Sequence, residues 1–480
     1  MKNYILVGLG PHAKRIYYPF LEKYRARFGI SLKLLIELES QAAKIDTYLS
    51  ERDLQPEHTL FIPDNASNRA GTSLDPLVLQ ELERLVETEH IDGIIISTEP
   101  KVHKIYAMWA LQHNIHVLMD KPVTAPLYSS TDLRAARQIY EDYLELEHAR
   151  QGSRAKFYIM CQRRNHKGYT FIRNYLKDFV SEFEIPVSYI DVYHADGAWN
   201  LPHEFGKENH PYKYGYGKLM HSGYHFVDLF AWLAGVNAAL PHAQPDAVRV
   251  FTAKFTPNDF FHQINEKAYD KLFHRKEISD FYRTYDPIRY DHFGELDAYI
   301  STQLMQGPNV ITTGSINLQQ NSFSRRSWFE LPEDTYKGNG RVRHERVTIQ
   351  VSHFLNIHVH SYQSHEPSLA VVEEGGVGSD DHFEILVFRN KKIVGGEVFQ
   401  KINMGKEMRE LHGNDAYYFG HNENAREVTL LNFIEANPDD SEFVLHGFTN
   451  QLLSHIYQSI AQGANTGNAQ LTFYPQKIYV

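Results

Sequence analysis

The first third of the chain alternates short apolar runs with longer segments whose apolar positions recur at helical spacing. The apolar runs predict buried strands at residues 3–7, 32–38, 59–62, 91–97, 116–119 and 156–160. The segments between them predict helices at residues 14–28, 41–50, 75–89, 102–113 and 131–150. Strands that alternate with helices in this way pair in parallel and carry helices on both faces. The pattern therefore predicts a doubly wound parallel sheet of the α/β class.

Beyond about residue 185 the pattern changes to strands with a period of two and few helices. One predicted strand has an apolar face made of Val347, Ile349, Val351, Leu355, Ile357 and Val359. Polar residues alternate with these on the opposite face, which indicates a large, mostly antiparallel open sheet with one covered face. Residues 384–388 and 393–399, on either side of a turn at 390–392, predict a hairpin. A last helix is predicted at residues 441–461, capped by Ser441 and followed by Gly463.

The chain has 480 residues, more than one hydrophobic core ordinarily serves, so we expect two domains. The change of pattern places an α/β domain at residues 1–160 and an α+β domain at residues 161–480. Residues 255–292 are aromatic and charged without a clear period, and we interpret them as an insertion. The sequence leaves open whether the aromatic rings of this insertion contact a ligand or only pack with one another.

Composition narrows the class of protein. A net charge of −10 without a long block of like charge argues against nucleic acid as a partner, because binding its backbone needs clustered Lys and Arg. No apolar run approaches the length of a membrane span, and the first one has five residues, so we expect no membrane segment and no secretory signal. Cys161 is the single cysteine, which excludes an internal disulfide. We therefore predict a soluble, cytoplasmic protein.

The first predicted strand leads directly into residues 8–13, Gly-Leu-Gly-Pro-His-Ala, and a helical pattern follows. A strand, G-x-G-x-x-A and a helix form the dinucleotide-binding fingerprint. Gly8 makes the tight turn, Gly10 lets the backbone approach a pyrophosphate, and Ala13 lets the helix pack closely on the strand. The helix N-terminus offers its unpaired N–H groups to the phosphates. We predict a Rossmann domain at residues 1–160, and a plain strand-to-helix turn is the alternative.

Glu37 stands at the end of the second predicted strand, 24 residues after Ala13. A carboxylate at this place accepts hydrogen bonds from an adenosine ribose and repels a 2′-phosphate, which favours NAD over NADP. Lys14 and Arg15 soften that preference, so NADP stays possible. The alternative is an ordinary exposed glutamate, since strand ends are often polar.

Two polar clusters follow the fourth and fifth predicted strands, where ligands gather in doubly wound sheets. Residues 98–103 read Thr-Glu-Pro-Lys-Val-His, and Asp120-Lys121-Pro122 comes after the fifth strand. A lysine with a lowered pKa beside a nicotinamide can bind a substrate hydroxyl and help to move its proton during hydride transfer. Read alone, Asp-Lys-Pro is also a common loop sequence.

A third cluster lies on a helix predicted from about Leu219. On it His221, His225 and Asp228 share one face, at spacings of four and three. One interpretation is a histidine acid/base with polar supports, and a second is a zinc site, since His-x-x-x-His binds zinc on a helix. The third is buried histidines with satisfied hydrogen bonds. The residues alone leave all three open.

Together these segments resemble the Gfo/Idh/MocA family, the relatives of glucose–fructose oxidoreductase and inositol dehydrogenase. The likeness covers residues 3 to about 169 and residues 215–233, and it is only architectural beyond them. Residues 8–13 look like the family's nucleotide loop and residues 98–103 like its loop after the fourth strand. Asp120-Lys121-Pro122 looks like the family's Glu-Lys-Pro motif with a shorter acid, and the lysine is the catalytic one in the family.

His225 and Asp228 match the end of the family's third motif, Gly-x-His-x-x-Asp, in which the histidine is the usual acid/base. His221 stands where the family commonly has aspartate. An anionic partner would raise the pKa of His225 and stabilise its protonated form, which a second imidazole cannot do. Glu99 likewise replaces an apolar or proline residue. The resemblance argues against a metal on this helix, because the family's chemistry needs none.

The resemblance also implies the reaction. It is hydride transfer between the nicotinamide of NAD, or of NADP, and a carbinol or carbonyl carbon of a sugar, polyol or sugar derivative. Two alternatives remain: an enzyme that retains NAD for a redox-neutral reaction, such as glycoside cleavage or epimerisation, and a non-enzymatic nucleotide-binding sensor. The catalytic residues we predict are Lys121, His225, His221 and Asp228. The predicted cofactor-binding residues are Gly8, Gly10, Pro11, His12, Ala13, Glu37, Thr98, Pro100, His103, Asp120, Lys121 and Pro122. The predicted substrate-binding residues are Arg163, Tyr169, His221 and His225.

The family's second domain is a large open sheet that covers the active site with one face and often makes subunit contacts with the other. The resemblance therefore implies a homo-oligomer, a dimer or tetramer, assembled through the C-terminal sheet. His358 and His360 lie two apart on one strand face, and we interpret them as part of that surface, since no third metal ligand is evident at a useful spacing. We predict no metal, no nucleic acid and no membrane as partners.

Overall fold

The computed structural model describes residues 2–64, 72–196, 205–206, 212–273, 280, 282–324, 342–364, 375–412, 415–416 and 418–475. Within the predicted insertion, residues 274–279 and 281 lie outside these ranges. The chain forms two compact units. The first consists of Met1–Ala125, Tyr140–His166 and His412–Asn450, and the second of Pro126–Ile139, Lys167–Leu411 and Gln451–Val480. The domain boundary predicted between residues 160 and 161 stays a prediction.

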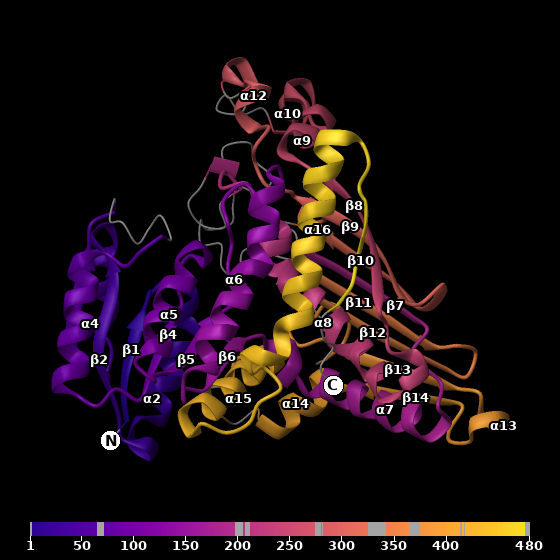
Figure 1. Cartoon of the computed structure of the whole chain (residues 1–480), viewed down its shortest axis with the longest axis horizontal. Coiled ribbons are helices and arrows are strands. Elements are labelled where there is room, and N and C mark those ends of the chain that lie inside the picture. The colour runs from indigo at the N-terminus through magenta and orange to yellow at the C-terminus, as the bar shows by residue number, and fades with distance from the viewer. Residues whose placement is uncertain are drawn as a thin grey trace. The chain divides into compact units, whose positions relative to one another are not determined.

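The first unit contains a six-stranded sheet in the order β3-β2-β1-β4-β5-β6, and all its pairs are parallel (Figure 1). Its strands are β1 (Lys2–Val7), β2 (Ile30–Leu38), β3 (Pro56–Ile62), β4 (Gly93–Ile96), β5 (His116–Asp120) and β6 (Phe157–Met160). The doubly wound sheet predicted from the sequence is confirmed. The strand order reverses between β1 and β4, and ligands bind outside the carboxyl ends of the strands at such a switch point.

The helices that belong wholly or mostly to the first unit are α1 (Pro11–Arg15), α2 (Tyr17–Phe28), α3 (Ala42–Leu49), α4 (Pro76–Thr88), α5 (His103–Gln112), α6 (Leu133–Gln151) and α15 (His421–Glu435). The helix predicted at residues 14–28 starts earlier and is broken at Ile16, whose φ of −113° departs from helical geometry. The short α1 therefore directly follows the glycine loop. α15 is not predicted by the sequence pattern, yet its Leu430 and Phe433 join the apolar cluster of β1, β2 and α2.

The second unit contains a nine-stranded sheet in the order β14-β13-β12-β11-β7-β10-β9-β8-β15. Its strands are β7 (Tyr189–Asp196), β8 (Ala247–Phe255), β9 (Asp297–Gln306), β10 (Asn309–Gln319), β11 (Val342–Val351), β12 (Leu355–Ser364), β13 (Glu384–Arg389), β14 (Phe399–Asn403) and β15 (Gln470–Phe473). Among these strands only β7 and β10 pair in parallel. The large, mostly antiparallel sheet is therefore confirmed.

The helices that belong wholly or mostly to the second unit are α7 (Lys167–Phe183), α8 (Tyr224–Ala234), α9 (Pro257–Gln263), α10 (Glu266–Phe273), α12 (Pro287–Tyr290), α13 (Lys391–Val394), α14 (Met404–His412) and α16 (Gly447–Thr466). α8 packs on β7 and β10. The contact is close, because a Cβ atom on Gly314 of β10 would lie 2.2 Å from the ring of Phe230. One face of the large sheet is thus covered by the helix that carries His225.

Three local predictions are wrong. The period-two run around Val347 forms two strands, β11 and β12, which pair so that Val347 lies opposite Val359 and both still point to the covered face. The second arm of the predicted hairpin is displaced, because α13 and Gly395 with a φ of 64° come first and β14 begins only at Phe399. The last helix begins at Gly447 rather than at Ser441 and continues past Gly463 to Thr466.

The aromatic residues of the predicted insertion pack with one another. The cluster consists of Phe205, Phe260, Phe261, Tyr269, Phe293 and Leu296, with Tyr212, Phe255, Ile264, Tyr282, Tyr285 and Tyr290 half-buried around it. These rings form a small second core at the end of β8 and the start of β9. In the part of the chain that the structure describes, no helix combines the length and the apolarity needed to cross a bilayer.

Candidate active site

The loop between β1 and α1 needs glycine at its first position. Gly8 has a φ of 87°, and a Cβ atom there would lie 2.3 Å from the carbonyl oxygen of Ser97, at the end of β4. Gly10 is the N-cap residue of α1, and apart from Gly10 and its two chain neighbours no atom of the described residues lies within 4 Å of the position that its Cβ would take. The space in front of Gly10 is therefore open to a phosphate, next to the start of the helix.

Glu37 is tied to this loop by its carboxylate. Its Oε2 accepts the backbone N–H of Leu9 at 2.7 Å, and its Oε1 accepts that of Leu38 at 2.8 Å. Each oxygen keeps a second lone pair for a ligand hydroxyl. Lys14 is engaged elsewhere, with its Nζ 3.3 Å from the carbonyl oxygen of Lys44, and burial lowers its pKa although Glu37 opposes that shift.

The basic residue Arg15 also has a partner, since its Nη2 lies 3.9 Å from a carboxylate oxygen of Glu423. Glu423 is buried on α15 and accepts a hydrogen bond from Arg426 at 3.1 Å. Both basic residues that would favour a 2′-phosphate, Lys14 and Arg15, therefore have contacts within the first unit, whereas the carboxylate of Glu37 lies at the nucleotide loop.

Asp120, the last residue of β5, connects three segments. Its carboxylate accepts hydrogen bonds from the hydroxyl of Tyr17 and, at 2.9 Å, from that of Ser97. Nε2 of His12 lies 3.7 Å from the same carboxylate. Burial raises the pKa of Asp120, while the hydrogen bonds from Tyr17 and Ser97 oppose the rise. The structure thus brings two predicted cofactor residues, His12 and Asp120, together beside the nucleotide loop.

Lys121 follows Asp120 directly, and its peptide bond to Pro122 is cis. Burial lowers the pKa of Lys121, and the nearby guanidinium of Arg426 adds to that effect while Asp120 opposes it. A lysine with a lowered pKa can donate a hydrogen bond to a substrate hydroxyl and help to move its proton. The direction of this shift is the one that the predicted role requires.

His103 joins the two loops that follow β4 and β5. Its Nδ1 lies 2.9 Å from the carbonyl oxygen of Pro122, and its Nε2 lies 3.1 Å from that of Thr98. Burial lowers its pKa to about 4, and the two carbonyl contacts oppose that shift. The ring is therefore neutral at pH 7, so only one of its nitrogens donates a hydrogen bond, and it packs between the carbonyl groups of Thr98 and Pro122.

The predicted substrate contacts Arg163 and Tyr169 are both buried. Nη1 of Arg163 donates to Oδ1 of Asn422 at 2.8 Å, and the hydroxyl of Tyr169 donates to Glu345. Their contact with a substrate stays a prediction. Asn422 and Arg426 of α15 lie beside predicted site residues, and sequence reasoning missed them because no motif marks α15.

The third cluster lies at the start of α8. The helix predicted from about Leu219 is present, and its first turn, Leu219–Gly223, is π-helical, a form that is frequent at functional sites. His225 and Asp228 are buried on α8, and His221 is half-buried on the π turn. The rings of Tyr212 and Tyr216 stand edge-on to that of His221, at centroid distances of 5.4 and 6.0 Å.

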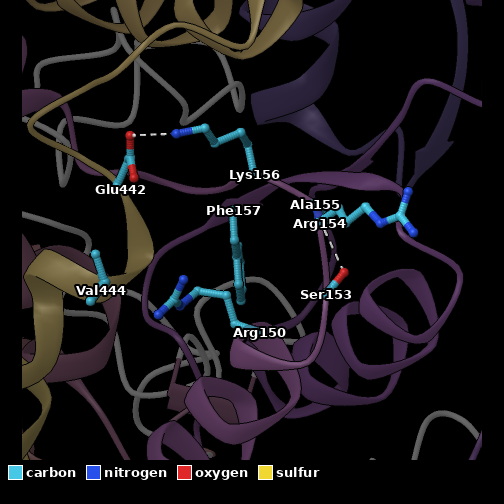
Figure 2. Close-up of a pocket in the computed structure, with 8 residues that line it drawn as sticks. All are labelled: Arg150, Ser153, Arg154, Ala155, Lys156, Phe157, Glu442 and Val444. Atoms are coloured by element: carbon cyan, nitrogen blue, oxygen red, sulfur yellow. Dashed lines mark hydrogen bonds and ion pairs between the residues drawn. The ribbon is translucent and has the colours of Figure 1, made fainter.

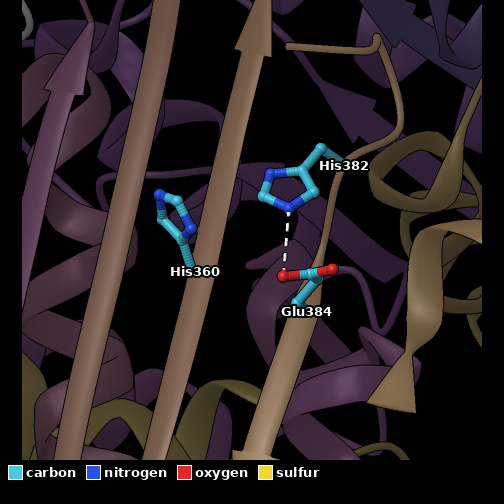
Figure 3. A group of neighbouring side chains, drawn as sticks. All are labelled: His360, His382 and Glu384. Atoms are coloured by element: carbon cyan, nitrogen blue, oxygen red, sulfur yellow. Dashed lines mark ion pairs between the residues drawn. The ribbon is translucent and has the colours of Figure 1, made fainter. Parts of the chain in front are cut away.

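The large sheet supplies donors near His360 that spacing alone did not reveal. His360, His382 and Glu384 offer ligand atoms that all lie within 4.8 Å of one another (Figure 3). However, Nδ1 of His382 accepts the backbone N–H of Tyr362 at 2.8 Å. The neutral ring must then carry its proton on Nε2, which faces Glu384 at 3.6 Å. This geometry favours a histidine–carboxylate pair over a metal centre.

A polar pocket of the first unit lies away from the nucleotide loop. It is lined by Arg150, Ser153, Arg154, Ala155, Lys156, Phe157, Glu442 and Val444, and Figure 2 shows Lys156 and Glu442 paired beside it. Six of its eight residues precede or begin β6, so it lies at the amino end of that strand. Because ligands of doubly wound sheets bind at the carboxyl ends, this pocket is not the dinucleotide site.

Part of the first unit matches a known family model. Residues 45–145 match the model of the Gfo/Idh/MocA family, described as "Oxidoreductase family, NAD-binding Rossmann fold". Over these residues the match agrees with the resemblance predicted from the sequence. A search of curated proteins found no match.

Solved structures of similar fold cover the whole chain. The WlbA dehydrogenase of Bordetella pertussis, solved with NADH and UDP-GlcNAcA, is 12% identical at a TM-score of 0.53, over 100% of this chain and 98% of its own. The aldose-aldose oxidoreductase of Caulobacter crescentus is 12% identical at a TM-score of 0.54, over 98% and 99%. An NAD-binding oxidoreductase of Klebsiella pneumoniae is 11% identical at a TM-score of 0.56, over 99% of each chain. At these identities the likeness shows the fold alone.

Proposed function

We propose that this protein is an NAD-dependent dehydrogenase or reductase that acts on a CH–OH group of a sugar, polyol or sugar derivative. The observation that carries the proposal is Lys121, which lies at the carboxyl end of β5 with a pKa lowered by burial. Bound NAD would accept or supply the hydride. The chain's own residues then have to bind the cofactor, hold the reacting oxygen and move one proton.

The first unit supports binding of the cofactor. Gly8 and Gly10 bring the backbone to open space at the start of α1, which suits a pyrophosphate. Glu37, fixed by two backbone N–H groups, suits the two ribose hydroxyls and repels a 2′-phosphate. Asp120 and His12, beside the same loop, are proposed to border the nicotinamide half.

Lys121 and His225 share the proton chemistry in this proposal. The ammonium of Lys121 donates a hydrogen bond to the substrate oxygen, and the imidazole of His225 takes the hydroxyl proton as hydride leaves the carbon. In the reverse direction His225 returns the proton to the carbonyl oxygen. His221 and Asp228, on the same helix, set the protonation and orientation of His225.

A sugar-like substrate is favoured by two neighbours of the same fold. One was solved with UDP-GlcNAcA, and the other is an aldose-aldose oxidoreductase. We also propose that the protein is cytoplasmic and forms a dimer or tetramer through the uncovered face of the large sheet. The large aromatic side chains of Tyr299 and Phe388 are 47% and 40% exposed on that face, and exposed apolar surface often marks an interface.

The first test is the cofactor. Purified protein is denatured, any released nucleotide is identified, and nucleotide-free protein is titrated with NADH and NADPH by fluorescence. Tight NADH binding with weak NADPH binding is expected from Glu37, whereas a preference for NADPH would refute its role. If folded protein binds neither nucleotide, the dehydrogenase proposal is wrong.

The second test addresses the chemistry. Sugars and sugar derivatives are screened for NADH formation, and the best substrate is given to Lys121→Ala and His225→Ala. Each variant is expected to lose about 100- to 10,000-fold in kcat, the usual size of an acid/base contribution. NADH affinity of both variants is measured as the control. Turnover near that of the unchanged protein in either variant would remove that residue from the mechanism.

A further inference from the structure

Glu295, two residues before β9, is a buried carboxylate with no part in the proposed chemistry. Its side chain has no exposed surface. Oε2 accepts the hydroxyl of Ser130 at 2.6 Å, and Oε1 accepts the hydroxyl of Tyr457 at 2.9 Å. Ser130 and Tyr457 are themselves buried. Burying a charge is costly unless it is well satisfied, so a group placed in this way has a specific task.

The same carboxylate holds the start of the helix that carries His225. Oε1 of Glu295 also accepts the backbone N–H groups of Gly217 at 3.2 Å and of Leu219 at 3.0 Å. These N–H groups stand at the N-terminus of the π turn, which continues as α8, and the first N–H groups of a helix have no acceptor within the helix. A negative charge is favoured at a helix N-terminus. Glu295 therefore caps this helix from a distant part of the sequence.

The backbones of the two segments are also locked together. The N–H of Lys218 donates to the carbonyl oxygen of Glu295 at 2.9 Å. A Cβ atom on Gly217 would lie 2.0 Å from that oxygen, and one on Gly294 would lie 2.0 Å from the carbonyl carbon of Tyr216. Neither position has room for a methyl group, so any shift of Glu295 is transmitted to the start of the helix.

The aromatic insertion in turn fixes Glu295. Phe293 and Leu296, on either side of it in sequence, belong to the aromatic cluster. Tyr212 packs against the same cluster, and its ring touches that of His221. Packed rings and Glu295 thus connect the insertion between β8 and β9 to the helix of the third motif.

The charge of Glu295 matters as well as its shape. The four groups that reach its carboxylate, from Ser130, Tyr457, Gly217 and Leu219, are all donors. An amide would turn its NH₂ toward at least one of them. Burial lowers the pKa of Lys254 while the carboxylate of Glu295 opposes that shift, so the carboxylate favours the positive charge of this lysine. An acceptor with two oxygens is the group that satisfies such a site.

We propose that Glu295 is the positioning residue of the active site: its carboxylate sets the π turn that carries His221 and so places His225, and the aromatic insertion exists to hold Glu295. This inference rests on the proposed function of His225 as acid/base.

The test compares Glu295→Gln with Ser130→Ala. Both disturb a buried hydrogen bond of the same carboxylate, but Ser130→Ala keeps the two bonds from the helix start to Oε1. Glu295→Gln is expected to lower kcat about 10- to 100-fold with little change in KM, as for a catalytic group moved by about 1 Å. NADH affinity stays unchanged in both variants, and Ser130→Ala keeps nearly the original kcat.

A double-mutant cycle separates positioning from loss of stability. In a His225→Ala background, Glu295→Gln is expected to cost little further activity, because its effect passes through His225. Equal losses in both backgrounds, or unchanged kcat in the single variant, would overturn the proposal. If Glu295→Gln does not fold, Glu295→Asp keeps the charge at a shorter reach and is expected to show the same kcat loss and the same cycle.

A readout without turnover keeps this test independent of the proposed function. Histidines are labelled with ¹³C at Cε1, and His225 is assigned by its absence in His225→Ala. Its resonance is expected to move in Glu295→Gln, whereas that of His103 in the first unit stays. If no sugar is turned over and the His225 resonance moves, the proposed function has failed and Glu295 still positions the helix. An unmoved resonance refutes the positioning itself.

Discussion

Two glycines of the nucleotide loop, two residues apart, are expected to respond to the same substitution in different ways. Gly8→Ala places a methyl group in a backbone with a φ of 87° and 2.3 Å from the carbonyl oxygen of Ser97. The left-handed backbone alone costs about 1–2 kcal/mol for a residue with a Cβ atom. The contact is with backbone, which no side-chain rotation relieves, so β1 and β4 must separate. We expect Gly8→Ala to lower the free energy of unfolding by about 3 kcal/mol.

Gly10→Ala serves as the matched variant. Its φ is −72°, and apart from Gly10 and its two chain neighbours none of the described atoms lies within 4 Å of the new Cβ position. An N-cap alanine in place of glycine costs less than about 1 kcal/mol of stability. The methyl group does occupy the space proposed for the pyrophosphate, so the affinity for NADH is expected to fall at least about tenfold, or 1.4 kcal/mol.

The assays are urea unfolding followed by tryptophan fluorescence and NADH titration of each folded variant. Gly8→Ala is expected to lose stability and affinity, and Gly10→Ala affinity alone. NADH binding by Gly10→Ala as tight as that of the unchanged protein would show that no phosphate approaches this loop. An unchanged unfolding midpoint in Gly8→Ala would contradict the strain assigned to the turn.

Three further predictions concern pH and assembly. Arg426→Met removes a cation that lowers the pKa of Lys121, so this pKa is expected to rise. The pH at which kcat falls to half of its maximum, as Lys121 loses its proton, is expected to rise with it. An unmoved pH profile would exclude Arg426 as a neighbour of Lys121. The pKa of His103 is about 4 in the fold and 6.5 when unfolded, so the unfolded chain binds more protons between these values and stability is expected to fall as pH drops from 6.5 to 4; His103→Gln, compared by urea unfolding across this range, is expected to flatten the slope. Tyr299→Glu and Phe388→Glu, on the uncovered sheet face, are expected to dissociate the oligomer in light scattering, and an unchanged mass would place the interface elsewhere.

Short-range patterns were sufficient for the first unit's sheet. The apolar runs around Ile5, Leu35 and Ile95 are dense, and glycines and helices separate them. The period and the length of each run therefore both indicate a strand. The nucleotide loop was predictable because its glycines serve a local turn. The sequence pattern predicts β11 and β12 as one strand, because no glycine or proline marks the turn between them, where Ser352 has a φ of 49°.

The residues that hold or tune the candidate site could not be predicted, because they lie far along the sequence from the site residues that they contact. Glu295 lies 76 residues after Leu219, at the end of a segment without period, and nothing distinguishes it from a surface glutamate. Arg426 lies more than 300 residues after Lys121 on a helix without a motif. Burial and partners decide the roles of such residues, and both depend on the complete fold.

The position of α15 in the sequence has a consequence for synthesis of the protein. Its Leu430 and Phe433 cover the face of the first unit formed by Tyr4 and Leu6, yet they are translated long after that sheet. At the usual speed of a ribosome, about 5–20 residues per second, the interval from residue 160 to residue 450 lasts roughly 15–60 seconds. For that time the part of this apolar face that α15 covers stays exposed on the nascent chain, and such exposed surface promotes aggregation unless chaperones bind it.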